Sequence, residues 1–342
     1  MYNNEIISFK DETIIIQKKK SNKSNLLYIL LIIIIICCII YIIELKGYIT
    51  DNQIKTENFY KKRHFFYIMA RQMKMRDHNM TYDESNLVTI QDKINYLTIH
   101  ESPDYKSKIV DKIGLHEYSK KVLGKDICVP ILKIYNHSNE VNLDELPNKF
   151  VLKCNHGSGM NIICNNKEYF NITVAKTLLN KWLSENYGII NYEFQYLNVK
   201  PKIFAEEFLK DNIEDYKVYC FHGKPKFIRV QKTIEGENKI NNYYDLDWKL
   251  TDLETGLPHY HRMENYTFQK PKKLNLMIEY AKKLSSEFVF VRVDFYEFNE
   301  TIYLGELTFT PSNGIFRLKN QEQCIYLGNL IDVNKIKKDL FN

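Results

Sequence analysis

The chain has 342 residues, of which 44% are hydrophobic and 26% are charged, and its formal net charge at pH 7 is +6. This composition supplies enough apolar side chains for a large core and excludes an intrinsically disordered chain. The lysines are spread along the sequence without a basic tract interleaved with aromatic residues, so the positive charge does not indicate nucleic-acid binding.

Residues 26–43 form an uninterrupted uncharged stretch, LLYILLIIIIICCIIYII. At about 1.5 Å per helical residue, its length just spans a hydrocarbon core of about 30 Å. No small-residue cleavage site follows, which argues against a signal peptide, and continuous β-branched apolarity argues against a buried helix. We therefore predict a single-pass transmembrane helix at 26–43, preceded by a tail at 1–25.

Charges near this stretch bear on its orientation. Four lysines lie within residues 18–23, before the predicted helix, and a second positive group, Lys61, Lys62 and Arg63, lies further along the chain. The positive-inside bias therefore favours a cytosolic N-terminus, with the rest of the chain on the other side of the membrane.

The cysteines do not predict a disulfide framework. Two of the seven, Cys37 and Cys38, lie in the uncharged stretch, which leaves an odd number without CxxC spacing. The remaining cysteines are Cys128, Cys154, Cys164, Cys220 and Cys324.

The next segments predict helices followed by a hairpin. Residues 44–85 contain NFYKKRHFFYIMARQMKM, whose apolar positions recur at helical spacing, so we predict a stalk helix that packs on the domain or lies at the membrane surface. Residues 104–124 predict one amphipathic helix ended by Gly124, and DICVPILKIY predicts a strand. From Pro147 onward, KFVLKCNH and NIIC predict two strands joined by a glycine turn.

Helices and strand pairs alternate over the remaining sequence. TVAKTLLNKWLSENYG predicts a helix, PKIFAEEFL a strand, and DYKVYCFHGKPKFIRVQK a strand pair that turns at His-Gly-Lys-Pro. A helix at 272–286 precedes a last pair, FVFVRVDFYEFNETIYLGELTF. This order predicts an α+β (mixed α/β) fold for one catalytic domain, residues 86–342.

The last strand pair carries the strongest candidate site. Asp294 and Glu306 lie among apolar residues, and a tight hairpin would bring both carboxylates to neighbouring positions. Carboxylates in such surroundings are costly unless they are paired or hold a hard cation, and two converging carboxylates suit Mg²⁺. Arg292 would face the same side of the strand and could neutralise phosphate charge. The alternative interpretation of these charged residues is that they form salt bridges from the strand to helices.

Two further segments have weaker signals. Lys153 precedes His156, Gly157, Ser158 and Gly159, and a lysine beside a glycine loop can neutralise a phosphate that the backbone N–H groups approach. Glycine hairpins without such a role are also common. Glu206, Glu207, Phe208 and Leu209 lie at a strand end, where backbone groups could hold an adenine edge.

Taken together and in this order, these segments resemble the ATP-grasp superfamily, and in particular its teichuronopeptide-biosynthesis (TupA-like) branch. The similar text runs from about Lys93 to Leu327 and includes DKIGLHEYSKKVLG, LPNKFVLKCNHGSGMNIIC, KPKIFAEEFL, DYKVYCFHGKPKFI, NNYYDLDW and FVRVDFYEFNETIYLGELTFTPSNG. The resemblance implies strand-pair lobes that enclose a nucleotide cleft.

The resemblance also implies roles for individual residues. The lysines would contact the phosphates of ATP, the glycine loop would close over them, Glu206 to Leu209 would hold adenine and Asp215 would contact the ribose. Asp294 and Glu306 would bind Mg²⁺, with Arg292 and Lys153 at the transferred phosphoryl group. The residues expected to hold ATP are Lys112, Lys153, Gly157, Ser158, Gly159, Glu206, Glu207, Leu209 and Asp215.

One position departs from the family pattern. Many relatives have asparagine two residues after the bridging glutamate, whereas this chain has Thr308, so the second metal position would be weaker or completed by Asn313. The implied reaction transfers the γ-phosphoryl group of ATP to a carboxylate, and a nucleophile then attacks the acyl phosphate, during synthesis or modification of a surface polysaccharide or peptide-polysaccharide. Charge neutralisation would dominate its catalysis.

Two other functions stay open. The first is a glycosyltransferase, because Asp245 and Asp247 form a DxD, the metal-binding pattern of glycosyltransferases that use nucleotide sugars. The second is a non-catalytic relative that binds nucleotide or glycan. We favour the ATP-grasp ligase because a DxD is short and a transferase leaves the other motifs unexplained. The expected partners are ATP, a carboxylate-bearing or glycan acceptor and the membrane. Because ATP is scarce outside the cytosol, this function conflicts with the orientation that the charges favour.

Overall fold

The computed structural model describes residues 5–10, 13–18, 34, 54–101, 103–233, 239–256, 260–262 and 266–336. Apart from Ile34, the stretch predicted to span the membrane lies outside these residues, and no helix within them is long and apolar enough to cross a bilayer. The chain divides into two compact units, Met1–Arg63 and His64–Asn342. In the first unit, β1 (Glu5–Lys10) and β2 (Thr13–Lys18) form an antiparallel hairpin.

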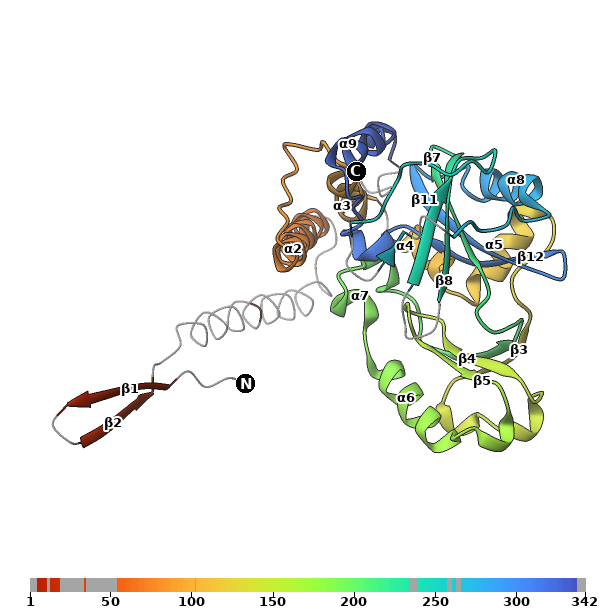
Figure 1. Cartoon of the computed structure of the whole chain (residues 1–342), viewed down its shortest axis with the longest axis horizontal. Coiled ribbons are helices and arrows are strands. Elements are labelled where there is room, and N and C mark those ends of the chain that lie inside the picture. The colour runs from red at the N-terminus through yellow and green to blue at the C-terminus, as the bar shows by residue number, and fades with distance from the viewer. Residues whose placement is uncertain are drawn as a thin grey trace. The chain divides into compact units, whose positions relative to one another are not determined.

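Two sheets form the framework of the second unit (Figure 1). The larger sheet has the strand order β10-β9-β8-β7-β11-β12, and the smaller sheet has the order β3-β6-β4-β5. All pairs are antiparallel except β9 with β10. The strands are β3 (Ile131–Tyr135), β4 (Phe150–Cys154), β5 (Asn161–Cys164), β6 (Ile203–Glu207), β7 (Asp215–Phe221), β8 (Lys224–Thr233), β9 (Lys239–Tyr244), β10 (Tyr260–His261), β11 (Phe290–Phe298) and β12 (Thr301–Thr308).

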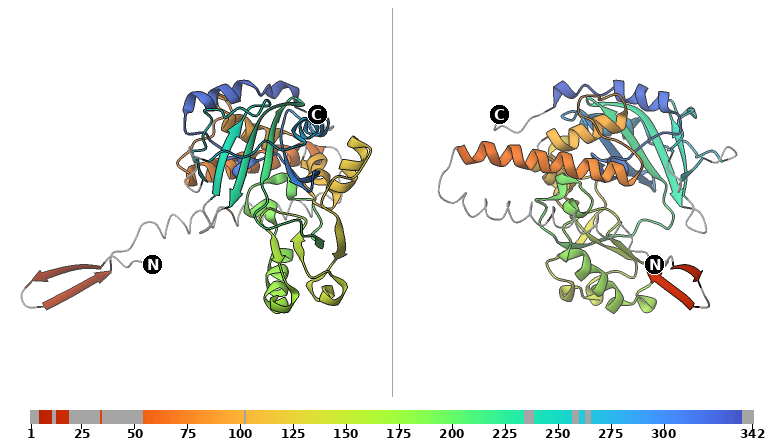
Figure 2. Two further views of the ribbon diagram at one scale, coloured as in Figure 1. Left: turned by 45° about the vertical axis from the view of Figure 1, so that its right-hand side comes forward. Right: turned by 90° about the vertical axis from the view of Figure 1, so that its left-hand side faces the viewer.

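Helices lie against both sheets (Figure 2). The α-helices are α2 (Ile54–Asp77), α3 (Ile90–His100), α4 (Pro103–Val110), α5 (Gly114–Leu123), α6 (Ile172–Ser184), α7 (Tyr187–Ile190), α8 (Leu274–Leu284) and α9 (Gln321–Asn329). The 3₁₀ turns are η2 (Ser138–Glu140), η3 (Leu143–Glu145), η4 (Lys167–Tyr169), η5 (Phe194–Tyr196), η6 (Pro311–Gly314) and η7 (Val333–Lys335). The mixed α/β fold and the predicted hairpins are therefore confirmed.

The strand pairs turn tightly because the turn residues adopt left-handed conformations. His222 and Gly223 join β7 to β8 with φ angles of 48° and 71°, and Asn299 and Glu300 join β11 to β12 with φ angles of 48° and 60°. Two successive left-handed residues match the right-handed twist of a hairpin, which fixes the register of both pairs.

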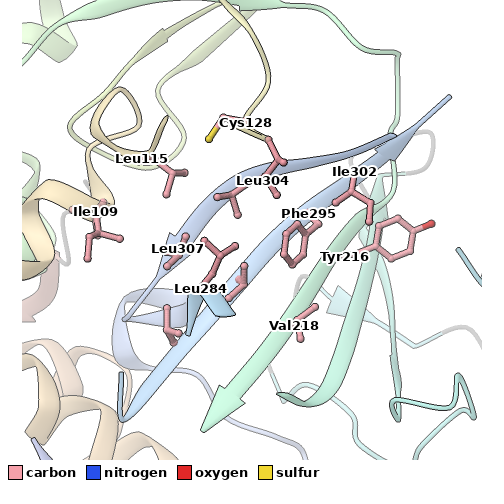
Figure 3. Close-up of a cluster of buried hydrophobic side chains, with 14 of the residues drawn as sticks. Ile109, Leu115, Cys128, Tyr216, Val218, Leu284, Phe295, Ile302, Leu304 and Leu307 are labelled. Carbon is pink, nitrogen blue, oxygen red and sulfur yellow. The ribbon is translucent and has the colours of Figure 1, made fainter. Parts of the chain in front are cut away.

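The main core lies on one face of the larger sheet (Figure 3). Because side chains alternate along a strand, Val218, Val293 and Leu307 share this face and are fully or almost fully buried. Leu284 of α8 packs against them. The register shifts between Asp294 and Phe295, where Glu306 pairs with the first residue and Leu304 with the second, so Gly305 has no partner across the pair. This bulge returns Leu304 to the core face.

One predicted helix is wrong in its continuity. Residues 104–124 form two helices, α4 and α5, separated at Asp111–Ile113. One local and one distant contact hold the break. The Asp111 carboxylate accepts the N–H of Ile113 at 2.9 Å, and the N–H of Lys112 donates to the carbonyl of Asn155 at 3.3 Å. Gly124 does end the second helix in a left-handed conformation, as predicted.

Helix α2 covers the segment whose apolar residues recur at helical spacing. The cysteines that the structure describes are free and buried, and Cys37 and Cys38 lie outside the described residues.

Candidate functional site

The face of the larger sheet opposite the main core carries a row of charged residues. Asp294 of β11 pairs in register with Glu306 of β12 on one side and with Lys217 of β7 on the other. Arg292 pairs with Thr308 one step along the same face. The predicted convergence of the two carboxylates is therefore present, and it results from the hairpin register.

The guanidinium of Arg292 connects this row. Its Nε donates to Asp294 Oδ1 at 2.6 Å, and its Nη2 donates to Asp294 Oδ2 at 2.6 Å and to Glu306 Oε1 at 3.1 Å. Thr308 lies within reach of the same guanidinium at 3.0 Å, and its hydroxyl donates to Glu306 Oε1 at 2.8 Å. The ammonium of Lys217 donates to Asp294 Oδ2 at 2.8 Å and also to Asp215.

Burial makes these charges depend on one another. Burial alone would raise the pKa of Asp294, but Arg292 and Lys217 outweigh it and hold that pKa below its ordinary value. Burial opposes the charge of Lys217, yet Asp215 and Asp294 hold the Lys217 pKa above its ordinary value. The pKa of Asp215 is raised by burial, against the attraction of Lys217, and its Oδ1 is buried without a hydrogen-bond partner.

The smaller sheet contributes the other charged group of the site. Lys153 of β4 and Glu206 of β6 form an ion pair. Lys112 lies in the break between α4 and α5, and its ammonium donates to the carbonyl of Gly157. Burial lowers the pKa of Lys112, while Glu306, Glu206 and Asp111 act in the opposite sense. Lys112, which bonds to the loop between β4 and β5 of the smaller sheet, is therefore attracted to Glu306 of the larger sheet.

A small cavity lies between the two sheets. Lys112, Lys153 and Glu206 line one side, and Tyr296 and Gly305 line the other. The segment before β3 also borders the cavity, and the N–H of Leu304 donates to the carbonyl of Ile127 in this segment at 2.7 Å. Both predicted lysines thus line one space with Glu206, and Glu306 follows Gly305 of its lining.

The glycine loop between β4 and β5 lies beside this cavity. Gly157 is buried and packs on Tyr187, since a Cβ on Gly157 would lie 2.6 Å from the Tyr187 ring. Ser158 and Gly159 are exposed, and Gly159 has a φ of 75°. Lys112 bonds to the first of these glycines, so the lysine that is predicted to bind phosphate contacts this loop.

The predicted adenine and ribose contacts divide between two places. Glu206 lines the cavity, whereas Glu207 is exposed and donates its N–H to the Pro130 carbonyl at 3.0 Å. Leu209 is half-buried just beyond β6. Asp215 contacts Lys217, and so it belongs to the charged row of the larger sheet.

The donor set suits a hard divalent cation. Asp294, Glu306 and Thr308 offer only oxygen ligands, which Mg²⁺ prefers, and ionised carboxylates keep lone pairs beyond those that Arg292 and Lys217 use. Asn313 lies in η6, after β12. Its side-chain amide donates to Asn191 Oδ1 at 3.3 Å and its backbone carbonyl accepts from Arg71. Neither of these partners belongs to the Asp294–Glu306 pair that Asn313 was predicted to complete.

The DxD has a local structural role. Asp245 Oδ1 accepts the N–H groups of Asp247 at 2.9 Å and Lys249 at 2.8 Å, and the Tyr244 ring stacks on Trp248 at a centroid distance of 4.4 Å. The Asp245 carboxylate therefore stabilises the turn after β9, and the glycosyltransferase interpretation has no support here.

Three residues of the site were not predicted. Lys217 follows Asp215 by two positions, and period-two alternation along the strand could have placed both on one face. Glu193 and Arg71 are buried charges with no local signal, because each depends on partners far away in the sequence.

Comparisons with known proteins give a family match. Residues 92–332 match the family described as TupA-like ATPgrasp. Similar solved structures include a D-alanine–D-alanine ligase from Bacillus anthracis complexed with ATP (15% identity, TM-score 0.35, 64% of this chain and 61% of that one). Others are a D-alanine–D-alanine ligase from Helicobacter pylori (15%, 0.36, 70% and 62%) and an L-amino acid ligase from Bacillus licheniformis (11%, 0.38, 65% and 45%). No curated protein matched in the corresponding search.

Proposed function

This chain belongs to the TupA-like ATP-grasp family, and from that premise we propose that it is an ATP-dependent ligase that activates a carboxylate. The observation that carries the proposal is the arrangement of charges at one cavity. Lys112 and Lys153 line this cavity, and Gly305 of its other side is followed by Glu306, which Arg292 joins to Asp294. This arrangement suits a triphosphate together with a divalent cation.

The residues of the chain have separate roles in the proposed reaction. Lys112 and Lys153 would neutralise the phosphates of ATP, and the glycine loop would exclude water from them. Asp294 and Glu306 would hold Mg²⁺, which when bound offsets charge on the phosphate oxygens. Arg292 would orient and neutralise the γ-phosphoryl group as it moves to the substrate carboxylate, forming an acyl phosphate and releasing ADP. An amine or other nucleophile would then displace phosphate.

We also propose that the product is part of a surface polysaccharide or peptide-polysaccharide and that residues 26–43 anchor the chain in a membrane. The support for the first proposal is the TupA-like family match, and the support for the second is the uncharged sequence ahead of α2. The acceptor would be a carboxylate-bearing molecule or a glycan.

Nucleotide binding by the full chain tests this function. Isothermal titration with ATP should show binding that Mg²⁺ strengthens, and ADP release should depend on an added carboxylate together with an amine. UDP-sugars and GDP-sugars with Mn²⁺ serve as comparison ligands. Binding of a nucleotide sugar without binding of ATP would contradict the ligase and restore the transferase.

A further inference from the structure

Arg71 of α2 is a buried arginine that lies ahead of the family match. Arg71 is 0% exposed, and the match to the family begins at residue 92. Burial lowers the pKa of Arg71 to about 10, while Glu193 acts in the opposite sense, so the guanidinium stays charged at neutral pH. A buried charge is costly to keep, which makes its partners informative.

The partners of Arg71 belong to two turns near the candidate site. Its Nη1 donates to the carbonyl of Tyr192 at 3.2 Å, and its Nη2 donates to the carbonyl of Asn313 at 2.7 Å. Both accepting residues are non-glycine residues in left-handed conformations, with φ angles of 56° and 55°. Such conformations persist only where surrounding contacts hold them.

The second of these turns is unusual over three residues. Ser312, Asn313 and Gly314 are left-handed in succession, with φ angles of 52°, 55° and 76°. Asn95 of α3 accepts from Arg71 Nε at 2.6 Å and donates to the Gly314 carbonyl at 3.0 Å. A Cβ on Gly314 would lie 2.1 Å from Arg71 Nη2, so the guanidinium occupies the space that any other residue would need.

Further bonds join the same two turns. The Asn313 amide donates to Asn191 at 3.3 Å, and the Thr310 hydroxyl donates to the buried carboxylate of Glu193. The first turn follows α7, whose Tyr187 packs on Gly157 and interacts electrostatically with Glu193. The second turn follows Thr308 of β12. The two turns therefore connect the glycine loop to the strand of the metal carboxylates.

Helix α2 is fixed at this junction by apolar packing as well. The ring of Tyr67 stacks on Phe194 at a centroid distance of 3.6 Å, and Ala70 and Met75 are buried beside it. Residues 67, 71 and 75 recur at four-residue spacing, so one face of α2 carries both the apolar contacts and the guanidinium. In Figure 2, α2 lies alongside the helices that cover the larger sheet.

We propose that Arg71 is a positioning residue of the site: by bonding to the Asn191–Glu193 turn and to the Thr310–Gly314 loop, it sets the glycine loop relative to Asp294 and Glu306. Helix α2 is then an integral part of the catalytic unit, although it precedes the family match. This inference rests on the proposed ATP-dependent function.

The test uses Arg71→Gln in the full chain, with Arg76→Gln as the matched control because Arg76 is exposed on the same helix. ATP affinity is measured by titration in EDTA and in Mg²⁺. We expect Arg71→Gln to keep its affinity in EDTA and to lose about tenfold or more of the strengthening by Mg²⁺, as supporting residues of metal sites do. Hydrogen exchange at residues 312–314 should rise in the same variant. Arg76→Gln should match the unsubstituted chain in both measurements.

A second variant decides the outcome if Arg71→Gln does not fold. Gly314→Ala places a methyl group against the guanidinium at a residue whose φ is 76°, so it should also reduce the Mg²⁺ effect. Full Mg²⁺ strengthening in a folded Arg71→Gln protein, or in a folded Gly314→Ala protein, would overturn the positioning role. Absence of ATP binding by the unsubstituted chain would instead refute the proposed function.

Discussion

Arg292 and Asp294 form a bidentate ion pair within one strand, with both nitrogen–oxygen distances at 2.6 Å. Asp294 is 1% exposed and Arg292 is 6% exposed, so neither charge has water as an alternative partner. The Asp294 carboxylate therefore stabilises the buried face of the sheet in addition to its proposed role as a metal ligand.

Asp294→Asn and Glu306→Gln should differ in stability while sharing one defect in binding. Asp294→Asn leaves the charges of Arg292 and Lys217 without their buried partner, so we expect a loss of about 3–5 kcal/mol in the free energy of unfolding. The Glu306 side chain is 28% exposed and its loss should cost about 1 kcal/mol or less. Urea unfolding measures both values. Equal losses would refute the buried-pair argument. Both variants should lose the Mg²⁺-dependent part of ATP binding.

Lys153→Met should weaken ATP binding without unfolding the domain. A charge-assisted hydrogen bond contributes about 1.5–3 kcal/mol, so affinity should fall by a factor of about ten to one hundred. Lys133→Met is the matched control, because Lys133 lies on β3 of the same sheet and pairs with Glu145 at the surface. Comparable loss of affinity in the control would assign the effect to general charge instead of the site.

The stability of the protein should fall through His156 as the pH drops below about 6.5. Burial lowers the pKa of His156 below its ordinary value of 6.5, partly offset by the Trp182 carbonyl. The native imidazole then binds fewer protons than the unfolded one, so its contribution is complete above pH 6.5 and is lost as pH falls toward the folded pKa. Unfolding of His156→Gln should depend less on pH over this range, whereas the exposed-site variant His137→Gln should retain the full dependence.

The described cysteines should resist thiol reagents in the native state. They are buried, and burial raises the pKa of Cys154 and Cys220 to about 12. In a chain with Cys37 and Cys38 replaced by serine, we expect no fast reaction with a disulfide reagent until denaturant is added. Rapid labelling of the folded protein would show that one of these thiols becomes exposed.

The sequence predicts the site where local patterns determine position. Asp294 and Glu306 could be brought together from the sequence because a short hairpin makes the partner of each residue nearly unique, and Lys153 stands beside a glycine turn for the same reason. The strand pairs follow from period-two alternation, and the end of α5 follows from Gly124.

The positions that were missed depend on contacts between distant segments. The break that releases Lys112 from a helix requires the Asn155 carbonyl, and the charge of Arg71 is accommodated by carbonyls at residues 192 and 313. Neither partner can be read from a local window, since an arginine on an amphipathic helix looks like any solvent-facing residue. The DxD was ambiguous in the sequence because turn-forming aspartates and metal-binding aspartates have the same spacing.

The bulge at Gly305 determines which residues of β12 face the candidate site and which face the core. Leu304 faces the core and Glu306 faces the charged row only because the unpaired Gly305 separates them, while their partners Phe295 and Asp294 are consecutive. If Gly305 were paired in an unbroken ladder, Leu304 and Glu306 would share one face, which would carry either the glutamate into the apolar interior or the leucine onto the polar surface. Alignments of related sequences must therefore place any single-residue gap in this strand with care, since an error of one position exchanges a ligand for a core residue.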